Sequence, residues 1–198
     1  MKKHNERRKS SCHDKSFINK SMSILKLIIT ATILFFMAGC ASMKPVAFEK
    51  SDIKLQPFKF FVGHARSYGV IENPGGKPKA LITTETVGII KDGVLNIEQD
   101  LYPEGGKINH RFWKLQQIDE HHFDATANDI DGTAHGLLYG NEFSWCFRLK
   151  FTERKFIKHV RMSQTMYLMP DGQAMIFRSI IRKFGFVVAQ ITEEFRKY

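Results

Sequence analysis

An alternating segment, Glu142-Phe-Ser-Trp-Cys-Phe-Arg-Leu-Lys-Phe151, interleaves large apolar side chains with smaller or polar ones. The large apolar positions are Phe143, Trp145, Phe147, Leu149 and Phe151. Successive side chains of an extended strand point to opposite faces, so this period of two predicts a strand with one buried face. Similar alternations over residues 95–101 and 160–168 extend the prediction to other parts of the chain.

Turn dipeptides separate the alternating segments. Asp92-Gly93, Asp131-Gly132 and Asp171-Gly172 are typical of hairpins, because glycine accepts the positive φ that tight hairpin turns require. No segment shows a helical stripe, although Ser179 to Phe186 is also compatible with a helical turn. The predicted strands cover 58–72, 80–90, 94–102, 107–118, 123–130, 133–139, 141–151, 157–169, 173–182 and 186–196.

Consecutive strands joined by short turns form either a sandwich or a closed barrel. Closure removes the unpaired edges of a sheet, and about nine or ten strands suit a small barrel of the lipocalin or streptavidin type. We therefore expect residues 58–198 to form an all-β, antiparallel up-and-down barrel. Its strands are too polar on one face for a porin-like barrel.

The amino terminus has the pattern of an export signal. A basic segment, Lys2–Lys26, precedes an apolar run, Leu27–Met37, and then Ala38-Gly39-Cys40. The run has eleven residues, whereas a membrane-spanning helix needs about 18 or more. Small residues directly before a cysteine resemble the lipobox of bacterial lipoproteins. The alternative is a short buried helix that contains a core cysteine.

The lipobox predicts cleavage between Gly39 and Cys40 and attachment of lipid, such as palmitate, to Cys40. The domains would then be a signal peptide at 1–39, the lipidated cysteine and a tether at 40–57, and the barrel at 58–198. Because the leader is long for this class, Met22 is a second candidate for the first residue. Ser42 favours the outer membrane, with the barrel facing the periplasm.

Removal of the leader would lower the net positive charge of the protein. The whole chain has a formal charge of +10, but residues 40–198 hold 22 basic and 18 acidic residues. This is an ordinary surface balance, so we expect no nucleic-acid partner. Cys146 is then the one unmodified cysteine, either half-buried and inert or exposed and reactive.

Metal and cofactor signals are weak. His121-His122 follows Asp119 at a predicted hairpin tip, where a solvated turn is the simpler interpretation. Asp129, Asp131 and His135 lie near one another in the sequence, but their spacing does not establish a ligand geometry. We expect neither a metal site nor a cofactor.

Catalytic motifs are missing from the sequence. It contains no Gly-x-Ser-x-Gly elbow, phosphate loop or dinucleotide fingerprint. Carboxylates such as Glu98 and Asp129 could act as a general acid and base, so an enzyme that acts on lipid or cell-wall material is the alternative hypothesis. A protein-binding module is a third possibility, but the sequence does not identify a protein partner.

Aromatic residues are the most informative feature of the predicted barrel. Trp113 and Trp145 belong to a large set of aromatic side chains predicted for the barrel interior. Arg111, Asp129 and Arg178 are the polar residues expected beside these aromatic side chains. An aromatic-lined cavity with a few cations would suit a lipid or fatty-acid ligand with an anionic head. The alternative is a filled barrel with a structural role in the envelope, since small barrels are usually packed with side chains.

Several of these residues form an ordered set that resembles a bacterial lipoprotein family, domain of unknown function 3833. The set is Arg111-x-Trp113, Ala127-x-Asp129-Ile-x-Gly132-x-Ala134-x-Gly136-x-x-x-Gly140-Asn141-x-x-x-Trp145 and Arg178-x-x-x-x-Lys-Phe184-Gly185. The resemblance covers residues 58–198 and implies a calycin-type barrel without implying any particular activity. The chain departs from the family pattern at Ser163-Gln164-Thr165 and at Phe177.

Overall fold

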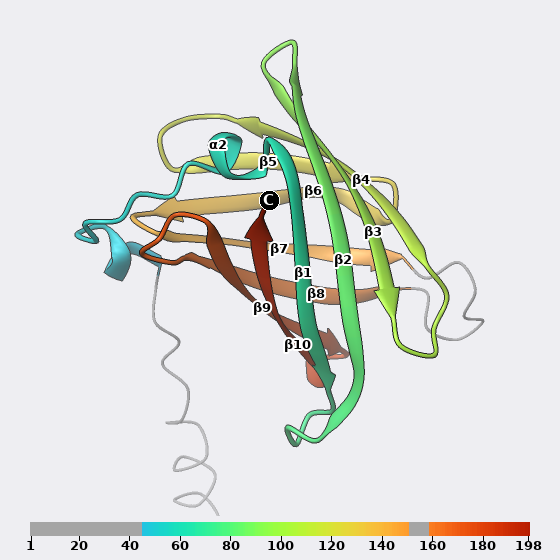
Figure 1. Ribbon diagram of the computed structural model, residues 1–198. Helices are drawn as coiled ribbons and strands as arrows, with labels where there is room; N and C mark the ends of the chain where they lie inside the picture. Colours follow the sequence, from blue (N-terminus) through green and yellow to red (C-terminus); the bar gives the residue numbers. More distant parts are fainter. Residues whose placement is uncertain (1–44, 151–158) are drawn as a thin grey trace, which may run out of the picture. The chain divides into compact units, whose positions relative to one another are not determined.

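The computed structural model describes residues 45–150 and 159–198 and shows ten antiparallel strands in a closed barrel (Figure 1). Each strand pairs with its neighbours in the chain, and the first pairs with the last. The strands are β1 Gly63–Glu72, β2 Pro78–Lys91, β3 Val94–Pro103, β4 Asn109–Gln117, β5 His122–Ala127, β6 Ile130–Tyr139, β7 Glu142–Lys150, β8 His159–Leu168, β9 Ala174–Lys183 and β10 Phe186–Lys197.

The closing pair of strands confirms the predicted architecture. β1 and β10 pair over eight residues, from Ala65 opposite Lys197 to Glu72 opposite Gln190. This seam leaves no free edge, as expected for an up-and-down barrel rather than a sandwich.

A short helix replaces the expected beginning of the first strand. Residues Pro57–Phe61 form helix α2, so the prediction of a strand from residue 58 is wrong for this segment. Pro57 occupies the first helical turn, where its missing N–H has no partner to lose. The helical turn buries both Phe60 and Phe61, which a strand would point to opposite faces.

The fifth hairpin turns earlier than predicted. The turn is formed by Asn128 and Asp129, whereas Asp131-Gly132 lies inside β6. Gly132 has a φ of +70°, and the β6–β7 register shifts between Asp131 and His135. The glycine therefore accommodates an irregularity within the strand instead of a hairpin turn.

The last hairpin is extended up to its turn. β9 continues through Lys183, so Ser179 to Phe186 contains no helical turn. Phe184 and Gly185 form the turn with φ values of 51° and 86°. Positive φ at both central positions gives the twist that a two-residue hairpin needs.

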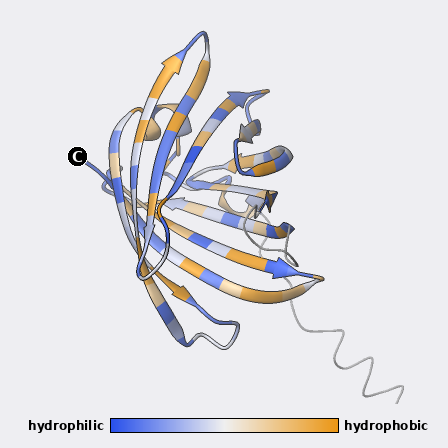
Figure 2. Ribbon diagram, turned by 90° about the vertical axis from the view of Figure 1, so that its right-hand side faces the viewer, coloured by the Kyte–Doolittle hydropathy of each residue, from blue (hydrophilic) through white to orange (hydrophobic). Residues whose placement is uncertain are grey.

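The barrel interior holds the apolar face predicted from the alternating segment. Phe143, Trp145, Phe147 and Leu149 of β7 are all buried in one core cluster. Figure 2 shows the same alternation of hydrophilic and hydrophobic residues along the strands. Phe151 lies outside the described residues.

Much of the expected tether packs on the barrel. Helix η1, Pro45–Phe48, lies against β6 and β7, and Leu55 is buried in the core. The Leu55 N–H donates to the Gly140 C=O at 2.8 Å. Residues 45–57 are therefore part of the folded unit and not a free linker, because Leu55 and its backbone find partners on the barrel.

Helix α2 covers the end of the barrel where β1 begins and β10 finishes. The ring of Phe61 packs edge-on against Phe177, with centroids 6.1 Å apart, and Lys197 Nζ donates to the Lys59 C=O at 2.9 Å. Among residues 45–150 and 159–198, no helix has the length and apolar character needed to cross a membrane. Lys44–Tyr198 form a compact unit of their own.

Replacing Gly88 by alanine tests the close packing of α2 against β2. A Cβ at Gly88 would collide with the carbonyl group of Phe61, which belongs to the backbone and cannot rotate away. We expect Gly88→Ala to lower the free energy of unfolding by about 1–3 kcal/mol, as overpacking does elsewhere, measured by urea denaturation. Gly75→Ala is the control, because its nearest atom is 3.5 Å away. Equal stability of the two variants would contradict this packing.

Candidate functional site

A cavity of about 180 Å³ lies inside the barrel. It is mostly apolar, with a few polar side chains that come from several strands. The polar lining is Thr84, Gln99, Arg111, Gln164 and Glu193. The apolar lining is Pro57, Phe61, Ile82, Ile97, Leu101, Trp113, Leu115, Phe143, Trp145, Leu149, Met162, Met166, Phe177, Ile181, Ile191 and Phe195. An apolar wall with a few placed polar groups is the usual composition of a small-molecule site.

Two stacked tryptophans form one wall of the cavity. The rings of Trp113 and Trp145 lie 4.6 Å apart at an interplanar angle of 21°. Trp113 Nε1 donates to Gln99 Oε1 at 3.1 Å, and Trp145 Nε1 donates to Gln164 Oε1 at 2.7 Å. Both buried indole N–H groups are therefore satisfied, and the glutamines hold the rings in place.

A partly buried ion pair joins β4 to the fifth hairpin turn. Arg111 Nε lies 2.8 Å from Asp129 Oδ2 and 3.0 Å from Oδ1, and Nη2 lies 2.7 Å from Oδ2. The Arg111 guanidinium is also 5.7 Å from the Trp113 ring. The pair anchors the turn through Nε and Nη2 of Arg111, a charge-assisted contact with two nitrogens of one guanidinium.

Glu193 places a carboxyl group inside the barrel. Its residue is 6% exposed, and its Oε1 accepts hydrogen bonds from Ser67 Oγ at 2.7 Å and Thr84 Oγ1 at 3.0 Å. Burial raises the pKa of Glu193, although the two hydrogen bonds and the charge of Arg111 act in the opposite direction. The carboxyl group therefore keeps its proton to higher pH than a free glutamate, and the neutral form can donate an O–H.

Three of the five residues predicted for the cavity line it. Arg111, Trp113 and Trp145 line it, and Asp129 is bound to Arg111. Arg178 is exposed on the outer face of β9, so its assignment to the cavity is corrected. The reason is strand parity: the neighbouring inward positions are taken by Phe177 and Ser179.

Four polar residues of the lining were not predicted from the sequence: Thr84, Gln99, Gln164 and Glu193. The last three occupy inward positions between apolar neighbours, as Glu193 does between Ile191 and Phe195. A polar residue at a buried step of an alternating strand was the available signal. Two positions that depart from the family pattern, Gln164 and Phe177, also line the cavity.

The two carboxylates considered for catalysis do not share a cavity. Glu98 is exposed on β3, where it lies on the opposite face from Ile97 and Gln99. Asp129 is engaged by Arg111. The arrangement thus gives no acid–base pair from these residues.

The histidine-rich turn is capped by its own aspartate. Asp119 Oδ1 accepts hydrogen bonds from the backbone N–H groups of His121 and His122, at 2.9 and 2.8 Å, and lies 2.8 Å from His122 Nδ1. The backbone hydrogen bond from His121 is the largest of the contributions that lower the pKa of Asp119 to about 2. The carboxylate is thus used in shaping an exposed turn.

The second group of acidic and histidine residues is divided among separate partners. Asp131 lies 3.1 Å from Lys150 Nζ and 2.8 Å from His159 Nδ1, whereas His135 pairs with Asp124 at 2.7 Å. Across the two described ranges, no three such side chains are grouped so as to hold a metal ion.

Cys146 lies half-buried on β7, with Arg161 Nε 2.9 Å from its Sγ. The proposed lipidation and cleavage residues Cys40 and Gly39, together with Met22, lie outside the described residues.

Comparisons with known proteins agree with the fold. The model of a family described as "Protein of unknown function (DUF3833)" matches residues 34–197. A solved S-type phycobiliprotein lyase from Guillardia theta is similar in structure, with a TM-score of 0.53 and 9% sequence identity. The match covers 71% of this chain and 90% of the lyase. It supports a lipocalin-like barrel and, at this identity, the fold alone. A comparison with curated proteins finds no match.

The raised pKa of Glu193 predicts a specific pH dependence of stability. The neutral carboxyl favours the folded state, so its contribution is complete below the ordinary pKa of 4.5 and is lost as the pH rises toward the folded-state value. We expect Glu193→Gln to unfold at a higher temperature than the wild type at neutral pH and to lose part of the pH dependence above 4.5.

Thermal unfolding across this pH range provides the measurement. Glu98→Gln removes an exposed carboxylate and is the matched control, with a profile expected to follow that of the wild type. Parallel profiles for Glu193→Gln and the wild type would contradict the assignment of a neutral buried carboxyl.

Proposed function

The chain belongs to the DUF3833 family of proteins of unknown function. We propose that it is an envelope lipoprotein whose barrel binds a slender lipid-like molecule. The apolar part of the ligand occupies the tryptophan-lined cavity, and an oxygen-bearing head reaches Arg111 and Glu193. The lipid on Cys40 holds the barrel at the outer membrane, facing the periplasm.

The buried carboxyl of Glu193 is the observation that carries the ligand proposal. Removing such a group from water is costly, and an apolar residue would fill a purely structural core at less cost. Glu193 shares the lining with Arg111, whose charge acts on its pKa. A neutral acid and a guanidinium nitrogen together offer two donors to one anionic head.

The size of the cavity limits the ligand class. Pockets for drug-sized ligands have about 300–1,000 Å³, and this cavity has about 180 Å³. The volume favours one narrow chain over a bulky ring system. A fatty acid with a short or medium chain has the required apolar body and anionic head.

The anchor proposal is supported by the sequence of the amino terminus. An eleven-residue apolar run behind a basic segment leads directly to Ala38-Gly39-Cys40. Helix η1, which begins at Pro45, contacts β6 and β7, so the interval between Cys40 and the folded unit is short. Such an interval would keep the barrel close to the membrane surface.

Binding of dodecanoate and dodecanol to residues 41–198 tests the ligand proposal. These residues include the whole compact unit that begins at Lys44. We expect dodecanoate to bind about tenfold or more tightly than dodecanol, because a hydrogen bond to a charged group contributes about 1.5–3 kcal/mol. Isothermal titration calorimetry gives both affinities.

Two variants locate the ligand. Ile181→Trp places a larger side chain in the cavity wall and is expected to abolish binding, whereas Lys114→Gln changes an exposed position on β4 and leaves binding intact. Failure of the wild type to bind either compound, or unchanged binding by Ile181→Trp, would favour the filled barrel with a structural role.

Labelling of cells with radioactive palmitate tests the anchor. We expect the wild type and Cys146→Ser to incorporate label and Cys40→Ser to incorporate none, because the lipobox directs modification to the cysteine after Gly39. Label on Cys40→Ser would show that the lipid, if any, is attached elsewhere.

A further inference from the structure

Three arginines form a row on the outer wall of the barrel. Arg148 of β7 is directly opposite Arg161 of β8, which is directly opposite Arg182 of β9. Like charges at directly opposed positions of a sheet destabilise it. We call Arg148, Arg161 and Arg182 the arginine row.

Acidic neighbours neutralise one end of the row at most. Asp131 lies 3.9 Å from Arg148, but the same carboxylate also contacts Lys150 and His159. Within residues 45–150 and 159–198, neither Arg161 nor Arg182 has a carboxylate at ion-pair distance, and Arg161 Nε donates instead to Cys146 Sγ. Counting the described residues alone, this wall has an excess of positive charge that an external anion can balance.

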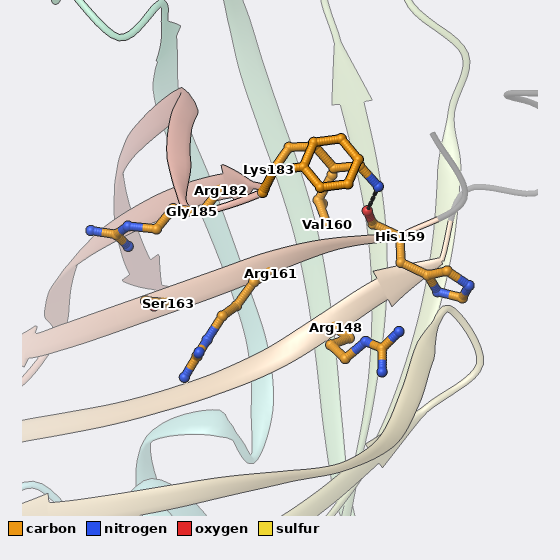
Figure 3. A pocket seen from close by; sticks show the side chains of 9 residues that line it. Arg148, His159, Val160, Arg161, Ser163, Arg182, Lys183 and Gly185 are labelled. Atoms are coloured by element: carbon orange, nitrogen blue, oxygen red, sulfur yellow. Dashed lines mark hydrogen bonds between the residues drawn. The ribbon is translucent and has the colours of Figure 1, made fainter. Parts of the chain in front are cut away.

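The arginine row borders an open groove of about 680 Å³ (Figure 3). The groove is also lined by His159, Lys183 and Phe184. Lys183 Nζ donates to the His159 C=O at 2.6 Å, which holds its ammonium group at the groove. Guanidinium and ammonium groups around an open depression suit phosphate oxygens.

An exposed aromatic tip adjoins the groove. Phe184 is 87% exposed and Phe186 is 76% exposed, on either side of Gly185 in the last hairpin. Phe184 also has a φ of +51°, a conformation that a bulky residue rarely adopts and that asparagine accepts more readily. Solvation and backbone preference both disfavour phenylalanine here, so an apolar environment outside the protein would explain its presence.

The amino-terminal segment contacts β7 and β8 at the ends of these strands that are remote from the arginine row. The ring of Phe48 in η1 packs 5.4 Å from the ring of Tyr167 in β8, and η1 also contacts β7. If Cys40 carries the proposed anchor, its five-residue interval to Pro45 spans at most about 17 Å. The arginine row and the aromatic tip do not depend on that anchor.

We propose that the β7–β9 wall docks on an anionic phospholipid bilayer. The arginine row binds lipid phosphates, and Phe184 and Phe186 enter the interfacial layer. This surface is outside the barrel and separate from the cavity. It would turn the barrel side-on to the membrane, with a defined face toward the lipid.

Vesicle co-sedimentation of unlipidated residues 41–198 tests the docking surface. We expect binding to vesicles of phosphatidylcholine with phosphatidylglycerol, weaker binding at high salt, and little binding to phosphatidylcholine alone. The double variant Arg161→Gln, Arg182→Gln is expected to bind about tenfold or more weakly, since each basic residue near an anionic surface contributes about 1 kcal/mol. Its unfolding temperature should not fall, because the row of like charges is interrupted.

Matched variants separate this surface from a general charge effect. Lys91→Gln, Lys114→Gln removes two exposed charges on β2 and β4 and is expected to retain most of the binding. Phe184→Asn is expected to bind more weakly while remaining at least as stable as the wild type. Equal binding to both vesicle types, or equal losses in the two double variants, would overturn the proposal. Abolition of binding by inorganic phosphate at constant ionic strength would also overturn it, in favour of a site for free phosphate.

Discussion

Pairing of β1 with β10 is the constraint on which the interior depends. Without this seam the ten strands would form an open sheet with two free edges. The seam also assembles the polar centre of the cavity, since Glu193 comes from β10 and its partners Ser67 and Thr84 come from β1 and β2. Closure of the barrel therefore creates the hydrogen-bonded environment of the buried Glu193 carboxyl group.

The barrel interior contains polar groups beside its apolar side chains, and these polar groups are hydrogen-bonded. Around the stacked tryptophans, hydrogen bonds from the indoles to Gln99 and Gln164 hold the wall in a defined geometry. Glu193 and Arg111 line the same cavity, and Asp129 of the fifth hairpin turn holds the Arg111 guanidinium. An interior built only for packing density would not need a carboxyl group with a raised pKa. A recessed polar centre within an aromatic wall instead suits a ligand with one apolar body and one polar end.

The outer face of β7, β8 and β9 is basic, whereas their inner face is mostly apolar. Side chains on the outside of β7, β8 and β9 include the arginine row, whereas the inside of the same strands holds Trp145, Met162 and Phe177. Strand parity makes this separation possible, because adjacent residues contribute to different surfaces. One set of strands thus supports both the proposed ligand cavity and the proposed membrane-facing groove.

Alternation and turn dipeptides predicted about nine or ten consecutive strands, and the cost of unpaired edges favoured a closed barrel over a sandwich. They failed where a local preference competed with the period-two pattern, as at Pro57–Phe61, which form a helical turn that buries two adjacent phenylalanines. Gly132 was misassigned because a glycine with positive φ serves a strand irregularity as well as a hairpin.

Within the site, Arg111, Trp113, Asp129 and Trp145 were predictable from residue type, but Arg178 was not, because a cation alone does not reveal strand parity. The pairing of Glu193 with Ser67 and Thr84 depends on residues more than 100 positions apart. No local pattern encodes such a contact, so the polar centre became visible only with the register of the barrel.

Native mass spectrometry of the full-length protein, purified from its host cells, tests the central claim most directly. We expect a fraction of the molecules to carry one additional small apolar acid, and the Ile181→Trp variant to lose that added mass. Protein free of any such molecule, together with no uptake of added fatty acid, would contradict the claim that the barrel is a ligand-binding container.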